Sequence, residues 1–355
     1  MNRKCLNRYI AVCVLLFSAL WGTACRSDHT AVAGDVPRLK EPLVTHLFTA
    51  DPSAHVFEGK LYIYPSHDPG TVGRQSLTGD QYDMRDYHVF SLESLDSPVI
   101  DHGRVLALPD VPWASRQFWA PDAAFRAGKY YLVFPARDKD DIFRIGVAVG
   151  SRPEGPFTPL PTPIPGSFSI DPALFIDNDG EAYLYFGGIW GGQLEKWRTG
   201  AFNQDDDGPF LGEPALGPRV ARMADDLLSF AGPVREVVIL DQDGNPLVAG
   251  DHERRFFEAA WMHKYRGLYY LSYSTGDTHF IVYAIGNNPF GPFTYRGRLL
   301  NPVSGWTTHH SIVEFQGKWY LFYHDSSLSG EDNKRCMKFT ELSYNPDGTI
   351  QTIDP

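Results

Sequence analysis

Three carboxylates in the sequence stand at the same point of a repeated phrase. Asp51 and Asp171 each begin an Asp-Pro dipeptide ahead of a short apolar segment, and Glu258 holds the equivalent place in Glu-Ala-Ala. Asp-Pro is a common turn dipeptide, so any one of these acids taken alone would be a structural residue. Like charges brought to one point repel each other, which costs stability. Their recurrence at equivalent positions therefore indicates a functional carboxylate cluster.

Carboxyl groups gathered in one cavity can hold and move protons. Burial and a nearby negative charge raise the pKa of one acid, which then stays protonated near neutral pH while a neighbour stays ionised. His309 begins a further copy of the same phrase and adds an imidazole to the group. Three carboxylates and a histidine directed at one cavity would form a site for chemistry.

The elements that must position these residues are five strand–turn–strand segments. Each runs from a polar residue through a short apolar strand to a turn glycine, and an aromatic-rich strand follows. The copies are DPSAHVFEGKLYIYPS from Asp51, PDAAFRAGKYYLVFPA from Pro121, DPALFIDNDGEAYLYFGG from Asp171, EAAWMHKYRGLYYLSYS from Glu258 and HHSIVEFQGKWYLFYHD from His309. Hairpins repeated at irregular spacings of roughly 50 to 90 residues are typical of propeller blades with insertions. Because the innermost strand of each blade lines one central channel, the residues that begin these strands should converge there.

Composition favours the same fold class. Aromatic residues make up 14% of the 355 residues, and 33 Gly with 27 Pro interrupt the chain frequently. We see no long stretch with helical periodicity, and all-β propellers of this length fold as one domain. The prediction is an all-β, five-bladed β-propeller in a single domain over residues 43–355, after a lead-in linker over residues 25–42.

Residues 1–24 have the pattern of a secretory signal peptide. Three basic residues precede the apolar run Tyr9–Trp21, and small residues follow it. The run is too short for a comfortable membrane span, and no later segment is long enough. We therefore expect an exported protein, periplasmic or secreted, with no membrane span. Lipid attachment at Cys25, as in an outer-membrane lipoprotein, is the alternative, and residues 31–33 (AVA) offer a rival cleavage site.

Charge and cysteine content exclude several classes of protein. The formal net charge is −11, and removal of residues 1–24, with three basic and no acidic residues, makes it −14. A chain this acidic repels phosphate backbones, so nucleic acid is not an expected partner. Beyond the signal, only Cys25 and Cys336 remain of four cysteines. These two give neither a disulfide framework nor a thiolate metal cluster.

The chain resembles glycoside hydrolase family 43, the five-bladed propellers that hydrolyse β-xylosides and α-L-arabinofuranosides with inversion. The resemblance covers essentially all of residues 43–354. It is carried by TADPSAHVFEGKLYIYPSHD, QFWAPDAAFRAGKYYLVFPA, SIDPALF, RRFFEAAWMHKYRGLYYLSYSTGDT and GWTTHHSIVEFQGKWYLFYHD. The family match implies that Asp51 is the general base, Glu258 the general acid, and Asp171 the acid that orients the general acid and raises its pKa.

The chemistry explains why such a site contains several acids. Cleavage with inversion needs one carboxylate to deprotonate a water and a protonated acid across the sugar. The two carboxyl groups must stand roughly 6.5 to 9.5 Å apart to admit that water, and opposite walls of a propeller channel can supply this span.

The resemblance also implies a metal. The family's His-x-Ser motif matches the segment that begins at His309, and in many members its first histidine contacts a calcium ion on the propeller axis. Calcium prefers oxygen ligands, so a site with one histidine would be largely filled by water. His309 is thus expected to be a calcium ligand or a hydrogen-bonded structural group. His310 is expected to contact substrate.

Three further residues are expected at the substrate. Trp119 in FWAPD can stack its ring on sugar CH groups, or it is a core aromatic of blade two. Asp122 in the same motif is assigned to structure or to sugar hydroxyl binding. Arg335 matches an arginine that reaches the bound sugar in related xylosidases, with a surface cation as the alternative.

The segment from Ile189 to Asp251 is longer than a blade connection needs, and an insertion near the channel mouth could close one end of a groove. That favours release of terminal sugars. We expect an exo-acting enzyme that releases xylose from β-1,4-xylo-oligosaccharides. An α-L-arabinofuranosidase acting on arabinoxylan or arabinan side chains is one alternative, and a non-catalytic carbohydrate-binding propeller is another.

Overall fold

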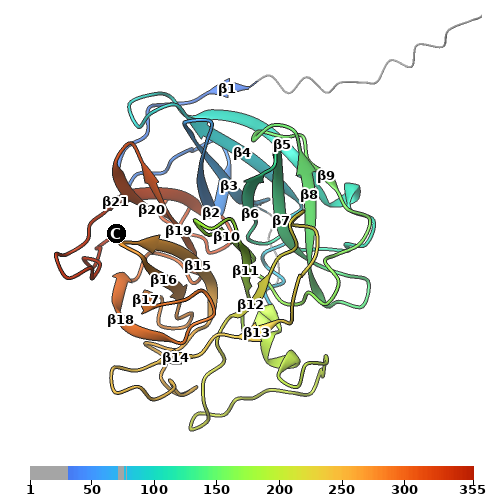
Figure 1. Cartoon of the computed structure of the whole chain (residues 1–355). Coiled ribbons are helices and arrows are strands. Elements are labelled where there is room, and N and C mark those ends of the chain that lie inside the picture. The colour runs from blue at the N-terminus through green and yellow to red at the C-terminus, as the bar shows by residue number, and fades with distance from the viewer. Residues whose placement is uncertain (1–30, 71–75, 77) are drawn as a thin grey trace, which may run out of the picture.

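Five blades surround a common axis in the computed structural model, which describes residues 31–70, 76 and 78–355 (Figure 1), and their strands are antiparallel except that β14 (Ile239–Leu240) pairs with β18 (Phe293–Leu300) in parallel. From the inside outward, blade one contains β2 (Phe48–Phe57), β3 (Lys60–Asp68), β4 (Asp86–Leu92), β5 (Ile100–Ala107) and β1 (Val32–Ala33). Blade two contains β6 (Asp122–Arg126), β7 (Lys129–Arg137), β8 (Phe143–Gly150) and β9 (Thr158–Pro159). Blade three contains β10 (Ala173–Ile176), β11 (Ala182–Phe186), β12 (Arg219–Arg222) and β13 (Arg235–Glu236).

Blades four and five complete the set. Their strands are β15 (Glu258–Tyr265), β16 (Leu268–Ser274), β17 (Ile281–Gly286), β18 (Phe293–Leu300) and β14 (Ile239–Leu240); β19 (His310–Phe315), β20 (Lys318–Asp325) and β21 (Cys336–Leu342). The helices among the described residues are the short 3-10 turns η1 (Leu108–Asp110), η2 (Trp190–Gly192) and η3 (Leu194–Trp197). None of them is long and apolar enough to cross a membrane.

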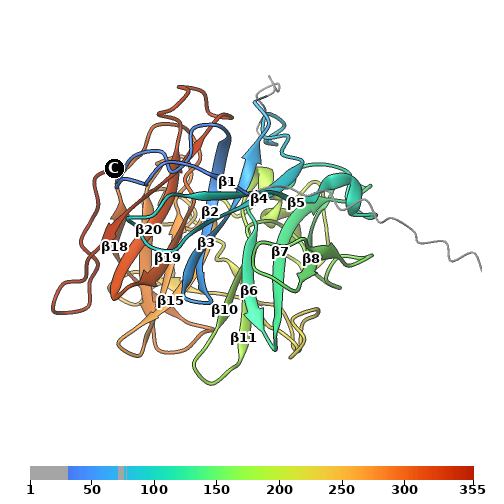
Figure 2. The same ribbon diagram turned by 90° about the horizontal axis from the view of Figure 1, so that it is seen from above.

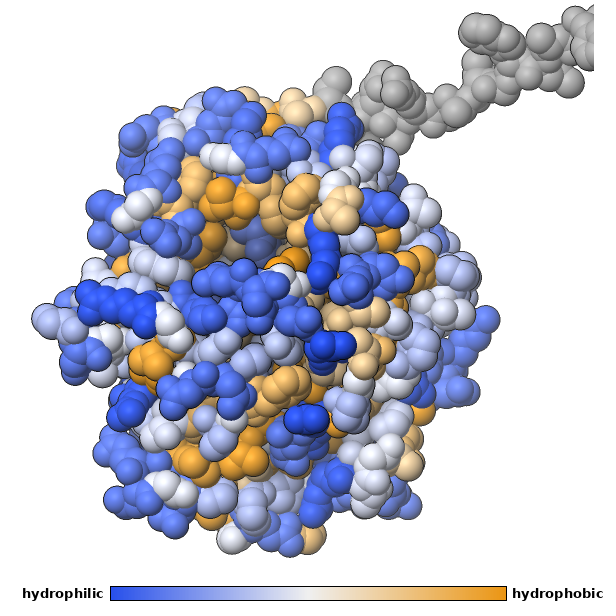
Figure 3. Space-filling model, viewed as in Figure 1, coloured by the Kyte–Doolittle hydropathy of each residue, from blue (hydrophilic) through white to orange (hydrophobic). Residues whose placement is uncertain are grey.

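The inner strands form a closed ring. β2 contacts β6, β6 contacts β10, β10 contacts β15, β15 contacts β19, and β19 returns to β2. Figure 2 shows blade five between blade four and blade one, where the ring closes. Figure 3 shows hydrophilic residues over most of one face of the molecule, with smaller hydrophobic patches among them. The predicted all-β, five-bladed propeller is confirmed.

The hairpins between inner and second strands have the turn chemistry that the repeat predicts. In four blades a two-residue turn ends in a glycine with positive φ, and the residue before it also has positive φ: Glu58-Gly59, Ala127-Gly128, Arg266-Gly267 and Gln316-Gly317. Two positive φ values define the type I′ turn, whose twist matches that of the flanking strands. Blade three instead uses a longer turn that contains Gly180.

The inner strands are irregular where the carboxylates stand. The pairing of β2 with β3 shifts register between Ala50 and Ser53, and Asp51 has a φ of 51°. β15 shifts register between Glu258 and Trp261, and Asp171, just before β10, has a φ of 53°. A bulge or a left-handed residue turns a side chain away from the usual alternation of a strand. The register shifts and the left-handed residues thus orient the side chains of the acids along the channel.

Blade five is completed by the chain that precedes β2. The amides of Lys40, Leu43 and Thr49 donate to carbonyls of β21 and of the residue before it, at 2.8 Å each. Leu43 is 5% exposed and packs in a hydrophobic cluster shared by blades one and five. Residues 31–42, expected to be a lead-in linker, thus run along the propeller's edge, where β1 pairs with β5. The signal peptide and Cys25 lie outside the described residues.

The segment Ile189–Asp251, expected to be an insertion at the channel mouth, is only partly one. It contains β12 and β13 of blade three and the edge strand β14 of blade four. The short lengths of β13 and β14, two residues each, hide their strand pattern in the sequence. The part that does lie at the mouth is η2, which carries Trp190.

Candidate active site

A cavity of about 560 Å³ lies where the inner strands begin, and all five blades contribute to its lining. Its polar lining includes Asp51 of β2, Asp171 before β10, Glu258 of β15 and His309 before β19. Trp119, which precedes β6, completes the set. The convergence of the strand-initial residues expected from the repeat is thus observed.

Asp51 is held by a dense set of donors. It is 6% exposed, its Oδ2 accepts a hydrogen bond from Ser66 Oγ at 2.5 Å, and its Oδ1 lies 3.3 Å from Arg335 Nη1. Burial alone would raise the pKa of this carboxyl, but the positive charge of Arg335 and the Ser66 hydrogen bond outweigh it and lower the pKa to about 2. Asp51 is therefore ionised at neutral pH.

A neutral histidine fixes the backbone at Asp51. The Asp51 amide donates to Nδ1 of His324 at 3.0 Å, so this nitrogen carries no proton. His324 Nε2 then carries the hydrogen and donates to the Thr307 carbonyl at 3.0 Å. Burial lowers the pKa of His324 to about 4, in agreement with this tautomer. The hydrogen-bonded imidazole holds the left-handed Asp51 backbone in place.

Arg335 is itself held by a second acid. Its Nε and Nη2 donate to the two oxygens of Asp68 at 2.9 and 2.8 Å, a bidentate pair, and its guanidinium carbon lies 4.8 Å from the Tyr82 ring centroid. Although burial disfavours a charged group, the carboxylates of Asp51 and Asp68 keep the pKa of Arg335 above its ordinary value. The expected surface cation is excluded, because Arg335 is 3% exposed and lines the cavity.

Glu258 meets the opposite environment. Its carboxyl group has no hydrogen-bond partner among the described residues, and it lines the same cavity as Asp51. Burial of this group, together with the negative charge of Asp51, raises its pKa to about 8. Glu258 is therefore protonated at neutral pH and can donate a proton.

Asp171 contacts the backbone beside Glu258. Its Oδ2 accepts a hydrogen bond from the amide of Ala259 at 2.8 Å, and Ala259 has a φ of 60°. Burial and the negative charges of Glu258 and Asp51 raise the pKa of Asp171 well above its ordinary value. Glu258 and Asp171 therefore disfavour each other's ionisation, and Asp171 fixes the chain direction at the point where Glu258 projects.

His309 can supply one nitrogen ligand to a metal ion, and few other protein ligands lie near it. It is 9% exposed, and its Nδ1 is buried without a hydrogen-bond partner among the described residues. Its Nε2 lies 3.9 Å from Asp171 Oδ2. No third imidazole or carboxylate atom completes a ligand cluster with them in the described part of the chain. These donors fit a calcium ion only if water supplies most of its ligands, an arrangement that calcium tolerates.

Aromatic side chains form the cavity walls, and sequence reasoning found only one of them. Trp119 lines the cavity and donates from Nε1 to the Tyr82 carbonyl at 2.8 Å. On another wall Trp190, Phe257 and Trp306 meet, with ring centroids 5.0 to 6.3 Å apart. The missed tryptophans stand beside glycines in GIWGG and SGWTT, a signal of exposed loops that could have indicated them.

A buried arginine connects the loops that carry these walls. Arg137 of β7 donates from Nη2 to the carbonyls of Thr78 and Gly191 at 3.3 Å each, and from Nε to Gln117 at 2.6 Å. Thr78 belongs to the loop after β3, and Gly191 to η2. Arg137 therefore holds together two loops that lie at the same cavity wall as Trp119.

Asp122 and His310 do not line the cavity, which favours the structural alternative for Asp122 and corrects the expected contact of His310 with substrate. Asp122 is 1% exposed, accepts hydrogen bonds from Ser53 and from the Leu174 amide, and so ties blades one, two and three together. His310 is fully buried and pairs with Ser272 of blade four at 2.6 Å. Both residues are structural.

The family model described as "Glycosyl hydrolases family 43" matches residues 40–350. The chain therefore belongs to glycoside hydrolase family 43 and is a glycoside hydrolase. A xylosidase/arabinosidase of Humicola insolens is 63% identical over 88% of this chain and 99% of its own. A xylosidase/arabinosidase of Bacteroides ovatus is 55% identical over 89% of this chain and 98% of its own.

A solved structure shares the fold. It is a family 43 β-xylosidase/α-arabinofuranosidase from a compost microbial metagenome, in complex with xylotriose and in a calcium-free form. It is 64% identical, covers 90% of this chain and 99% of its own, and superimposes with a TM-score of 0.89.

Proposed function

We propose that this protein is an inverting, exo-acting β-xylosidase that releases xylose from β-1,4-xylo-oligosaccharides. The observation that carries the proposal is the pair of opposite acids in one cavity. Asp51 is held ionised by Arg335 and Ser66, whereas Glu258 has no hydrogen-bond partner among the described residues and is kept protonated by burial and the charge of Asp51. An ionised base and a protonated acid facing one sugar are what a single displacement needs.

Each acid has one step in this mechanism. Glu258 gives its proton to the glycosidic oxygen as the bond to the leaving sugar breaks, so the leaving group departs as a neutral alcohol. Asp51 takes a proton from a water that attacks the anomeric carbon from the opposite face. Asp171 keeps Glu258 in position through the Ala259 amide, and a negative charge on either of these two carboxyl groups disfavours ionisation of the other.

The lining supports a sugar substrate. Aromatic faces of Trp119, Trp190 and Trp306 can stack on sugar CH groups, and Asp277 and Asp332 can accept bonds from hydroxyls. Because walls enclose the cavity on several sides, binding of the end of a sugar chain is favoured over binding of its middle. Relatives named xylosidase/arabinosidase support xylose release, with arabinofuranose removal as a second activity of the same site.

Turnover of nitrophenyl β-xyloside and nitrophenyl α-L-arabinofuranoside by purified protein tests both substrates. Faster turnover of the xyloside is expected, and a clear preference for the arabinofuranoside would replace the main proposal by the second. No turnover of either, with binding of xylo-oligosaccharides retained, would identify a non-catalytic carbohydrate-binding propeller.

The stereochemistry has its own test. Inversion of a β-xyloside releases α-xylose first, which proton NMR detects before mutarotation. Initial release of β-xylose would mean a retaining mechanism with a covalent intermediate and would contradict the role of Asp51 as a base.

Calcium at His309 is a further part of the proposal, supported by the orphan Nδ1 and the single-histidine donor set. A bound ion would supply positive charge on the axis close to the carboxylates. Added calcium should then raise the melting temperature of chelator-treated protein, because a ligand that binds only the folded state stabilises it. The effect should weaken in His309→Ala. An unchanged melting temperature in the wild type would exclude the ion.

Export is proposed from residues 1–24 alone. Mass spectrometry of the mature protein distinguishes cleavage at residues 31–33 from a lipid-modified Cys25. An intact residue 1 in the mature protein would contradict export through this signal.

A further inference from the structure

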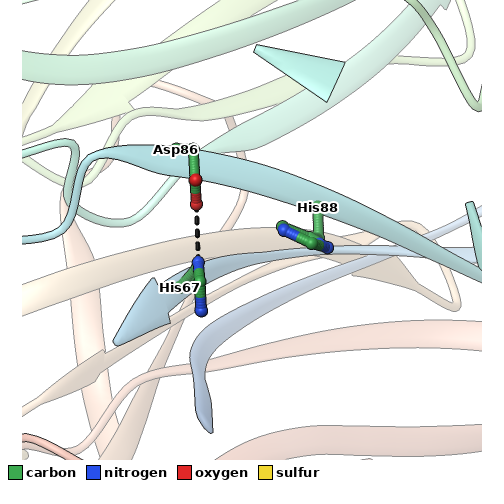
Figure 4. A group of neighbouring side chains, drawn as sticks. All are labelled: His67, Asp86 and His88. Carbon is green, nitrogen blue, oxygen red and sulfur yellow. Dashed lines mark hydrogen bonds and ion pairs between the residues drawn. The ribbon is translucent and has the colours of Figure 1, made fainter. Parts of the chain in front are cut away.

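A second group of ligand-type side chains lies in blade one, outside the cavity. It consists of His67 of β3 and Asp86 and His88 of β4, and one ligand atom of each lies within 4.8 Å of the others (Figure 4). None of these residues lines the active-site cavity. Neither the proposed mechanism nor the family motifs quoted above assign them a role.

The register of the sheet explains why they meet. β3 and β4 are antiparallel with Ser66 opposite Tyr87, which places His67 opposite Asp86. Asp86 and His88 are two residues apart on β4, so their side chains stand on the same face of the sheet. The His67 and His88 ring centroids are 5.0 Å apart. The cluster is therefore built on paired strands and not on a loop.

The donor set has the chemistry of a transition-metal site. Two imidazoles and one carboxylate bind zinc, cobalt or nickel, whereas calcium and magnesium prefer oxygen ligands alone. Three protein ligands leave one position of a tetrahedral ion open to water. We propose that His67, Asp86 and His88 bind a divalent transition-metal ion, with Zn²⁺ as the preferred ion.

A second carboxylate is placed to orient one of the ligands. His88 Nδ1 is buried without a hydrogen-bond partner in the described part of the chain, and it lies 3.7 Å from Asp101 Oδ1 of β5. The other oxygen of Asp101 pairs with His46 Nε2 at 2.7 Å. Metal-bound histidines commonly direct their second nitrogen to such a carboxylate. This arrangement would leave His88 Nε2 free to bind the ion.

The ion has to replace a hydrogen bond. His67 Nδ1 and Asp86 Oδ1 share a hydrogen bond of 2.6 Å, which an ion between them would replace. Each ligand atom binds the ion through a lone pair, so this hydrogen bond must open before the ion can bind. The side chains of the three ligands are 15 to 21% exposed, so an ion can enter from solvent. Arg104, opposite His88 on β5, is exposed and can turn into solvent.

Calorimetric titration of the untagged full chain with ZnCl₂, and separately with CaCl₂, tests the proposal. We expect one Zn²⁺ to bind the wild type. The variants His67→Ala and His88→Ala should each bind at least roughly 100-fold more weakly, and Asp101→Asn roughly 10- to 100-fold more weakly.

Two matched controls separate this site from other histidines. His102→Ala removes a neighbouring imidazole of β5 that bonds to Ser91 instead, and His309→Ala removes the axial histidine. Both should keep wild-type zinc affinity. Circular dichroism must show that each ligand variant is folded, with His88→Gln as the replacement where His88→Ala is not.

Three outcomes would overturn the proposal. The first is the absence of Zn²⁺ binding to the wild type, and the second is unchanged affinity in folded His67→Ala and His88→Ala. Loss of zinc binding in His309→Ala alone would assign the ion to the axis and would also contradict it. Because the readout is binding, the result does not depend on whether xylosides are the substrate.

Discussion

At the residue scale, two carboxyl groups in one cavity have different pKa values because their neighbours differ. Arg335 and Ser66 stabilise the charge of Asp51, while Glu258 has no hydrogen-bond partner in the described part of the chain and lies near the negative charge of Asp51. Desolvation acts on both groups in the same direction, so the contacts decide between them. Ionisation of the base therefore depends most on Arg335, and Asp68 fixes Arg335 through a bidentate ion pair.

Replacement of the proposed acid should affect substrates unequally. Glu258→Gln cannot donate a proton, so kcat for xylobiose should fall by about 10²- to 10⁴-fold. A nitrophenyl xyloside, whose leaving group needs no proton, should lose much less. Steady-state kinetics on both substrates measures the difference, and an equal loss on both would show that Glu258 is not the acid.

The pH profile of kcat/KM should follow the two pKa values. Activity needs ionised Asp51, with a pKa of about 2, and protonated Glu258, with a pKa of about 8. It should therefore persist on the acid side until the protein unfolds, and fall as the pH rises through about 8.

The Glu258→Gln variant provides the control for this profile. The residual activity of this variant on xylobiose should lack the alkaline limb, because the group that titrates is gone. An alkaline limb at the same pH in this variant would assign the titration to another residue. A wild-type kcat/KM that does not fall as the pH rises through about 8 would contradict the raised pKa of Glu258.

Local backbone geometry explains which of the candidate site residues reach the cavity. Asp122 occupies the same place in its motif as Asp51, but β6 pairs with β7 without a register shift, so its side chain lies between blades. His309 and His310 are adjacent, and neighbouring strand residues face opposite ways, so only one reaches the cavity. Hydrophobic patterns predict strands but not bulges, and the bulges select the side chains that reach the site.

At the element scale, the cavity depends on loops that pack against each other. Phe257 precedes Glu258, and its ring packs against Gly276, which has a φ of 70°. The loop after β16 thus supports the wall next to the proposed acid. Such support between distant segments leaves little trace in a single sequence, whereas the hairpins, which depend on local turn residues, could be predicted.

A methyl group at Gly276 should displace that wall. In Gly276→Ala the new carbon overlaps the Phe257 ring, so Glu258 should shift and kcat/KM should fall by roughly 10- to 100-fold. Gly267→Ala is the matched control, since Gly267 also has a positive φ but has no atom within 4 Å of the new carbon. It should lose only about 1 to 2 kcal/mol of stability. Similar kcat/KM in both variants would exclude the packing argument.

At the scale of the whole molecule, closure of the ring joins distant parts of the chain. Leu43 packs between blades one and five, and its amide bonds to Met337 of β21. The repeat in the sequence predicted the number of blades, because each hairpin is a local pattern. It could not predict this seam, because residues 31–47 carry no copy of the repeat.

Truncation at the seam should destabilise the whole propeller. Leu43→Ala should lower the free energy of unfolding by about 2 to 5 kcal/mol, since Leu43 is 5% exposed in a packed cluster. Leu39→Ala, at a side chain 49% exposed, should change it by no more than about 0.5 kcal/mol. Urea denaturation compares the two, and equal changes would show that the seam does not limit stability.

The pairing of Arg335 with Asp68 spans 267 positions of the chain. During synthesis the ribosome makes Asp51 and Asp68 early, and the arginine that both carboxylates need arrives only after four of the five blades are complete. A nascent or prematurely terminated chain thus lacks the arginine that holds the base in the finished cavity. Hydrolytic activity consequently begins only when translation is nearly finished, and it can serve as a direct assay for chains that have been made and closed in full.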